Sequence, residues 1–415
     1  GIPTSKPEAS GMSTVAASMA GPSRSWPART LSIQPLVLTL AAFFLPMKAL
    51  AMSAGGQSVY LPYLALLPLT AVAIRPLAGI FARFFGGATL TVLGLSVFYY
   101  WQSNFDAGVF VFAAKVVVTL AMASLYIHLL RQDERAVMRY LFAGIAISIV
   151  YMVYQGISAL LFGANLPLTS ITALDIGRGI GQRFGFVRVT GFTEEPSYIA
   201  VILVGSALML YTYAKRSGES QRWRIAVIVA GLLLCTSNNL FATLPLLAVF
   251  SLFFYLRVPF LFFVVFYLGN LFVAPRLLNL DESFFARFSS YSQFMALPQS
   301  RWWFGIGFNR YATLETAQYI SPEGLPGLVV SSIASLWGGI LLEGGIVFTT
   351  LFCTYISRVC TQARSAAGYS LVAILIMLAN YYSPWWPIVS LAIAYAIVSR
   401  EPFRIRESNM EAQAT

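Results

Sequence analysis

Residues 108–130 read GVFVFAAKVVVTLAMASLYIHLL, and Lys115 is the only charged residue in this run. About 20 apolar residues in a helix span the hydrocarbon core of a bilayer, and a soluble core does not need so long a run. The sequence therefore predicts an all-α, polytopic membrane protein with about 12 transmembrane helices. The other predicted spans are roughly 33–52, 58–74, 86–102, 138–163, 197–214, 224–236, 240–256, 258–274, 332–356, 368–382 and 385–399.

The composition supports this class and excludes others. Of 415 residues, 58% are hydrophobic and 10% are charged, whereas a soluble domain carries about 25% charged residues. The unbroken runs also exclude an outer-membrane barrel, whose segments alternate over roughly 10 residues. A single histidine argues against a histidine-based metal site, and the three cysteines lie in or beside apolar runs, which predicts no disulfide framework.

The placement of the basic residues predicts the orientation of the chain. The net charge is +11, but most basic residues fall in short loops between the spans, and loops rich in Lys and Arg face the cytoplasm. We therefore expect both termini to be cytoplasmic. The excess positive charge is explained by topology, so nucleic acid is not an expected partner.

Three regions are expected along the chain. Residues 1–30 are predicted to be disordered, and residues 1–11 resemble the remnant of an expression tag ahead of a natural start at Met12. Residues 31–400 are predicted to form a single transmembrane domain. Residues 401–415 are expected to be a cytoplasmic tail.

Two long outer loops, 164–196 and 275–331, are predicted between spans, and loops of this length are usually functional. Arginine binds phosphate through paired hydrogen bonds and stays charged, so arginines on the outer face suggest clamps for a phosphate group. Acidic residues on the same side leave no broad cationic field, and salt bridges are the alternative explanation for about half of these arginines. The seven arginines of the two loops are Arg178, Arg183, Arg188, Arg276, Arg287, Arg301 and Arg310.

The first loop ends in the motif RVTGFTEEPSYIA (188–200). Pro196 suits the first turn of a helix, where its missing N–H has no partner. Glu194 and Glu195 then lie against the positive end of the helix dipole, within reach of Arg188. The alternative is a plain helix start with capping acids and an interfacial arginine.

The second loop contains the motif RWWFGIGFNRY (301–311). Its tryptophans suit the membrane–water interface, and glycines between aromatic residues let the backbone approach a bulky ligand. The GIG triplet is not a dinucleotide fingerprint, because the strand–turn–helix context is missing. The alternative is a re-entrant segment anchored by its aromatic side chains.

Charged residues within the predicted spans are the remaining candidates, since a charge in the bilayer is costly and marks a functional site by default. Lys115 lies about a third of the way into its span, where it either snorkels outward or faces a cavity beneath the outer loops. Glu343 requires a partner. His128, at the inner end of its span beside Arg131, is predicted to be structural.

The motifs resemble those of bacterial O-antigen and exopolysaccharide polymerases. FGIGFNRY (304–311) is similar to the Gly-x-Gly-aromatic stretch of their second outer loop, which precedes a span with Glu-Gly, here Glu343 and Gly344. The related O-antigen ligases carry a functional histidine in the large outer loop, which this chain lacks, so the resemblance favours a polymerase. The matching residues of the first motif are Arg188, Gly191, Glu195, Pro196 and Ser197.

The resemblance implies a fold like that of the GT-C-type glycosyltransferases, which use lipid-linked donors, and a location in the bacterial inner membrane. The implied reaction is metal-independent polymerisation of undecaprenyl-pyrophosphate-linked repeat units at the periplasmic face. Expected partners are those lipid-linked glycans and membrane lipids, with a chain-length regulator and a flippase as further candidates. No cofactor is expected.

Roles can be assigned on this basis to individual residues. Arg188 and Arg287 are expected to stabilise the departing pyrophosphate, and Glu195 is expected to act as base or to position an arginine. Six further residues are expected to bind substrate: Arg310, Arg301, Glu194, Lys115, Tyr198 and Tyr311.

Two alternative functions are compatible with the sequence. A ligase would transfer finished glycan to a lipid core. A transporter or lipid flippase would need a charged cavity across the membrane, whereas the mid-span charges are limited to Lys115 and Glu343. Transporters often contain inverted repeats, and no internal repeat is visible in this sequence.

Overall fold

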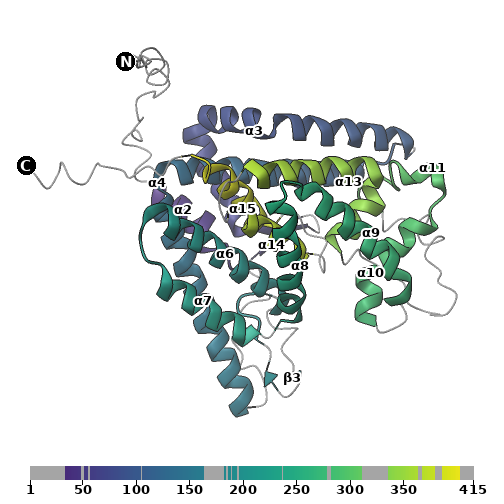
Figure 1. Cartoon of the computed structure of the whole chain (residues 1–415). Coiled ribbons are helices and arrows are strands. Elements are labelled where there is room, and N and C mark those ends of the chain that lie inside the picture. Colours follow the sequence, from purple (N-terminus) through teal and green to yellow (C-terminus); the bar gives the residue numbers. More distant parts are fainter. Residues whose placement is uncertain are drawn as a thin grey trace, which may run out of the picture.

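The chain is dominated by helices (Figure 1). The computed structural model describes residues 33–47, 51–54, 57–103, 105–162, 182–183, 186–187, 189–193, 196–235, 237–277, 282–310, 335–362, 367–378 and 386–401. Within these ranges the strands form two antiparallel hairpins. One pairs β1 (Ala51–Ala54) with β2 (Gln57–Tyr60), and the other pairs β3 (Gln182–Arg183) with β4 (Phe186–Val187).

Five helices of the described chain are long and apolar enough to cross a membrane. The predicted helical class is therefore confirmed, together with helices that could span a membrane. These helices are α3 (Leu66–Gln102), α4 (Val109–Phe162), α6 (Pro196–Ser217), α9 (Pro259–Leu277) and α13 (Leu336–Gln362).

Shorter helices complete the described fold. The apolar ones are α2 (Gln34–Leu38) with its continuation η2 (Thr39–Phe43), α7 (Arg222–Cys235), α8 (Asn238–Tyr255), α14 (Ala367–Met377) and α15 (Pro387–Val398). A short 3-10 helix, η3 (Leu61–Ala65), precedes α3. Two helices lie within the predicted second outer loop, namely α10 (Glu282–Ala296) and α11 (Gln299–Trp302).

Two pairs of predicted spans are joined, so the structure does not confirm a count of about 12. The runs at 58–74 and 86–102 belong largely to α3, which kinks at Ala73, and the residues between them are helical. The runs at 108–130 and 138–163 belong to α4. Asp133 breaks α4 with φ −155° and ψ 82°, and its Oδ1 accepts a hydrogen bond from the Ala136 N–H at 2.8 Å. An aspartate in this position caps the second half of the helix. The two predicted spans are therefore separated by a break at one residue, where the sequence predicts a loop.

The helix α4 lies at the centre of the packing and contacts α3, α7, α15 and η2. The phenol of Tyr126 on α4 donates to the Ala41 carbonyl at 2.6 Å, which fastens η2 to the bundle. Nearly every residue of α14 and α15 is buried. Helices that are apolar on all sides are expected in such central positions.

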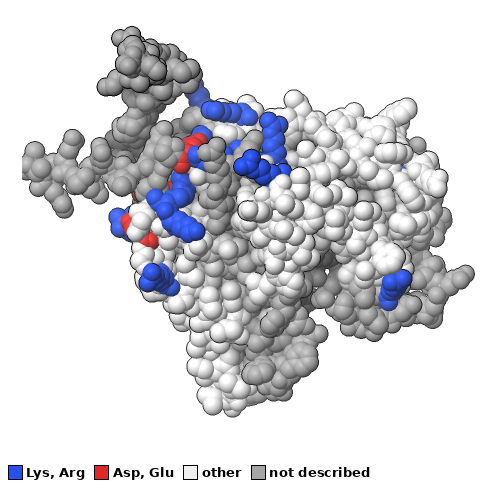
Figure 2. All heavy atoms as spheres, in the orientation of Figure 1, with Lys and Arg blue, Asp and Glu red and all other residues white. Residues whose placement is uncertain are grey.

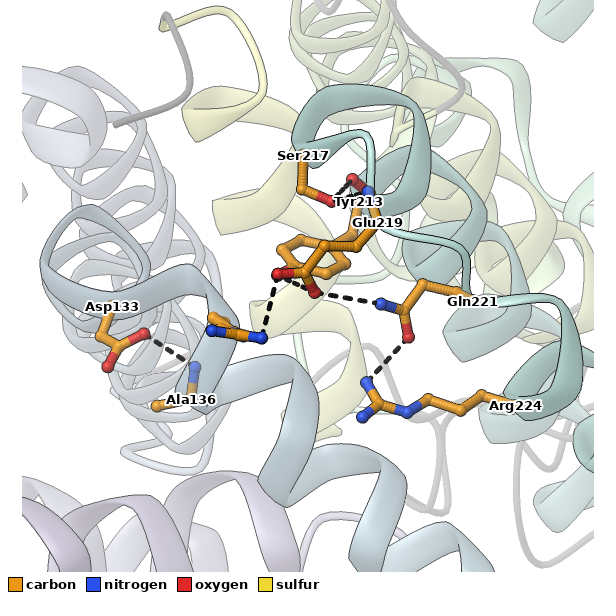
Figure 3. A network of polar contacts seen from close by, with 8 residues as sticks. Asp133, Ala136, Tyr213, Ser217, Glu219, Gln221 and Arg224 are labelled. Carbon is orange, nitrogen blue, oxygen red and sulfur yellow. Dashed lines mark hydrogen bonds and ion pairs between the residues drawn. The ribbon is translucent and has the colours of Figure 1, made fainter. Parts of the chain in front are cut away.

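Described charged side chains gather at one end of the molecule, at the upper left of Figure 2, where α4, α6 and the end of the chain meet. Figure 3 shows part of this network. Glu219 pairs with Arg135 at 3.2 Å and accepts hydrogen bonds from Tyr213 at 3.1 Å and Gln221 at 3.5 Å. These residues come from segments that the charge pattern assigns to the same, cytoplasmic side.

Candidate functional site

The helix α13 is interrupted at Gly345, the residue directly after the predicted Glu-Gly motif. Gly345 adopts φ 63° and ψ −170°, a region essentially restricted to glycine. A Cβ atom there would lie 2.5 Å from the Trp303 carbonyl oxygen. The backbone of the second outer-loop motif therefore approaches α13 so closely that only a glycine fits.

The segment Phe304–Phe308, which we call the docked segment, pairs with the interrupted helix through its backbone. Ile306 N donates to the Leu342 carbonyl and Gly307 N to the Glu343 carbonyl, both at 3.0 Å. An unbroken helix would satisfy these carbonyls from its own next turn, so the docked segment replaces the lost bonds. The FGIGF and LEGG motifs thus form one structural unit.

Aromatic side chains hold the docked segment against two further helices. The Phe308 ring is fully buried and stacks on Phe112 of α4 at 4.2 Å between ring centroids. It also meets Tyr99 at 4.8 Å and Phe348 at 4.9 Å in edge-on contacts. The Tyr99 hydroxyl donates to the Phe304 carbonyl at 2.6 Å. The segment is therefore anchored to α3, α4 and α13 together.

Glu343 and Lys115, two charged residues predicted within spans, interact electrostatically beside this unit. Glu343 is 2% exposed, and its charge interacts with Lys115 of α4 and with Tyr99 of α3. Lys115 is half-buried and lies one helical turn from Phe112. Lys115 thus supplies the opposite charge that the position of Glu343 in an apolar helix requires.

The docked segment continues into Arg310, which lies near Asp106 in the connection between α3 and α4. Arg310 Nε is 4.0 Å from Asp106 Oδ2, and the side chains are 14% and 40% exposed. Asn309 donates to the Gly108 carbonyl at 3.2 Å, and Gly108 N donates to Asp106 Oδ1 at 2.8 Å. The Arg310 guanidinium is thereby held at a fixed place between two connections that are about 200 residues apart in sequence.

Residues 189–193 of the first motif are bound to α4 through Gln155 and through an aromatic contact. Gln155 Oε1 accepts hydrogen bonds from Thr190 N at 3.1 Å and Gly191 N at 2.9 Å. Gly191 has φ 60°, and Phe192 stacks on Tyr151 at 4.4 Å. This buried turn leads into α6, which begins at Pro196 as the sequence predicts.

The predicted site residues are distributed unevenly over this structure. Arg310 and Lys115 lie beside the docked segment, and Arg301 is half-buried on α11, just before it. Tyr198 packs instead against Trp386 at the beginning of α15, with 4.8 Å between ring centroids. Arg287 lies on α10, but its side chain is outside the described set. The remaining predicted residues, Arg188, Glu194, Glu195 and Tyr311, also lie outside the described residues.

Sequence reasoning missed Gln155, Phe308 and Tyr99. Gln155 carried a signal, since an uncharged polar side chain in an apolar span seeks a hydrogen-bond partner. Phe308 carried a signal as the aromatic residue of the Gly-x-Gly-aromatic motif, whereas Tyr99 carried none, because it is indistinguishable from the many other aromatic residues in the spans. His128, predicted to be structural, hydrogen-bonds Gln132 at 3.0 Å and lies about 20 Å from Lys115 along α4.

The arrangement combines a partly buried guanidinium and its acid with a second acid–base pair between two apolar helices. Such a set can bind an anion at the end of a helix bundle. Comparisons with protein-family models, curated proteins and solved structures find no match for this chain.

Proposed function

We propose that this protein polymerises undecaprenyl-pyrophosphate-linked oligosaccharide repeat units at the periplasmic face of the bacterial inner membrane. The growing glycan would be transferred from its lipid carrier to the incoming repeat unit. One observation carries the proposal: FGIGFNR and LEGG, which resemble polymerase motifs, form a single unit that gathers Arg310, Lys115 and Glu343.

The proposed chemistry needs positive charge and a base. The bond between the anomeric carbon and the diphosphate oxygen breaks, and undecaprenyl pyrophosphate leaves. Arg188, Arg287 and Arg310 would stabilise the departing negative charge, as a metal ion does in other enzymes. Glu195 would accept the proton of the attacking sugar hydroxyl as the new glycosidic bond forms.

Purified protein incubated with an undecaprenyl-pyrophosphate-linked repeat unit tests the proposal. A polymerase produces a ladder of lipid-linked glycans with regular spacing on a gel. Glycan transferred to a lipid core without elongation would instead indicate a ligase. Movement of the lipid across proteoliposome membranes without any new glycosidic bond would indicate a flippase.

Variants connect the activity to the site. Arg188→Ala, Glu195→Ala and Arg310→Ala are each expected to lower the elongation rate by about 100-fold or more, the usual effect of removing a group that stabilises transition-state charge or transfers a proton. Arg139→Ala is the matched control, because Arg139 is exposed just after the break in α4, about 24 Å from Gln155 along the helix. A full ladder from all three variants would refute the proposed roles.

A further inference from the structure

An apolar groove of about 330 Å³ lies between α3, α4 and α13, and Figure 1 shows α3 and α13 running alongside one another. Val92, Leu120 and Phe352 contribute to its walls, one from each helix. Arg358 is the one charged residue of the lining. This volume falls within the range of pockets that bind small molecules, about 300–1,000 Å³.

The part of the groove beyond the interruption of α13 matches one leaflet of a bilayer in length. The lining on α13 begins at Ile340, before the interruption at Gly345, and beyond it extends from Phe348 to Arg358, which is about 15 Å at 1.5 Å per residue. The hydrocarbon core of a bilayer is about 30 Å thick, so one leaflet contributes about 15 Å. An apolar groove of this length between spanning helices fits a single acyl chain.

The two ends of the groove differ in polarity. At one end Phe112 and Phe348 pack against the buried Phe308 ring of the docked segment. At the other end the exposed Arg358 forms no ion pair with a carboxylate in the described chain. Among the lining residues, the charged group that can meet a polar headgroup is therefore at the Arg358 end.

A second cation and a buried hydroxyl accompany Arg358. Arg400 donates to the Val359 carbonyl at 3.2 Å and lies near enough to Arg358 and Tyr355 for their charges to interact. Burial lowers the pKa of Arg400, and the like charge of Arg358 acts in the same direction. The Tyr355 hydroxyl is buried and has no hydrogen-bond partner among the described residues.

The acid next in sequence, Glu401, contacts two other arginines. The Glu401 carboxylate bonds the guanidinium of Arg131 on α4, and its carbonyl accepts a hydrogen bond from Arg216 at 3.2 Å. Two neighbouring guanidinium groups and an unsatisfied hydroxyl at the end of an apolar groove are complementary to a phosphate that carries an acyl chain.

We propose that the groove binds one acyl chain of an anionic glycerophospholipid, with the phosphate between Arg358 and Arg400 and the Tyr355 hydroxyl donating to it. The lipid occupies the end of the bundle where the charged residues gather, away from the docked segment. This assignment does not depend on the glycosyltransferase function, because Arg358, Arg400 and Tyr355 lie outside that site.

Native mass spectrometry of delipidated protein in detergent tests the assignment. Phosphatidylglycerol and phosphatidylcholine with identical acyl chains are the probes, and phosphatidylglycerol is expected to bind more tightly with a stoichiometry of one tight site. Arg358→Gln and Tyr355→Phe should each weaken its binding, by about tenfold for the arginine, which loses a charged hydrogen bond. Arg222→Gln, a matched change at an exposed arginine on α7, should leave binding unchanged.

Three results would overturn the proposal. Equal affinity for the two phospholipids would show that the arginines do not select the anionic headgroup. Unchanged binding to Arg358→Gln protein of native thermal stability would place the lipid elsewhere. Displacement of phosphatidylglycerol by undecaprenyl phosphate at lower concentration than by phosphatidylglycerol itself would assign the groove to the carrier lipid of the substrate.

Discussion

The pairing of Lys115 with Glu343 shows how single residues are tolerated in an apolar setting. Glu343 sits in an α13 segment whose neighbours are almost all buried and apolar, where an isolated carboxylate would be strongly destabilising. Its interaction with Lys115 joins α4 to α13. Removing one partner leaves the other charge uncompensated, whereas removing both does not.

A double-mutant cycle measures this pairing. Glu343→Gln and Lys115→Met are each expected to lower the free energy of unfolding, and the double variant should lose less than the sum, with a coupling of about 0.5–3 kcal/mol. Unfolding in SDS titrations gives the four values. Strictly additive losses would show that the two charges are independent.

At the scale of elements, the docked segment supplies the backbone hydrogen bonds that α13 loses at its interruption. The backbone bonds between residues 303–307 and 342–347 depend on glycine at both faces of the contact, since a Cβ at Gly305 would lie 2.5 Å from the Leu342 carbonyl oxygen. The position of Arg310 follows from this contact, because it is the third residue beyond Gly307. A change in this backbone contact is therefore expected to shift Arg310 in the candidate site.

Gly345→Ala is expected to displace the docked segment and to destabilise the protein by about 1–3 kcal/mol, through backbone strain and steric overlap. Limited proteolysis should then cut near residue 305, and elongation activity should fall. Gly269→Ala is the control: Gly269 is an exposed helical glycine with open space around it, so alanine should stabilise α9 by up to about 1 kcal/mol. Equal behaviour of the two variants would argue against a rigid docked segment.

At the scale of the whole molecule, a buried polar network joins several helices at the end where the charged residues gather. Glu134, just after the α4 break, pairs with Arg216 at the end of α6 at 3.4 Å and accepts a hydrogen bond from Tyr395 of α15 at 2.9 Å. The Arg216 guanidinium also reaches the Glu401 carbonyl. Three helices and the segment after α15 are thereby held in register.

The buried pair Glu134–Arg216 differs in exposure from the neighbouring surface pair Arg135–Glu219. The side chains of Glu134 and Arg216 are 7% and 11% exposed, whereas Arg135 is 63% exposed. Glu134→Gln is expected to cost about 3–5 kcal/mol, because it leaves Arg216 buried without its counter-charge. Arg135→Gln should cost less than about 1 kcal/mol. Denaturant titration of both variants in one detergent makes the comparison, and similar losses would contradict a buried network.

Local patterns were sufficient for much of the architecture. Long apolar runs predict spanning helices wherever they occur, because a bilayer leaves the backbone no other way to satisfy its hydrogen bonds. The proline at position 196 likewise predicts the first residue of α6, since its missing N–H has no partner in the first turn of a helix. Such inferences need only a residue and its immediate neighbours.

The candidate site required contacts between distant parts of the chain. The local sequence does not indicate that the Glu343 carbonyl bonds Gly307, or that Gln155 binds the turn at Gly191. In both cases the two partners are 36 residues apart, and their local sequence patterns are unrelated. The merging of predicted spans has the same origin: whether a charged stretch bends away as a loop or continues as helix depends on what packs against it. Backbone groups freed in one helix were satisfied by another segment, and only folding brings the two together.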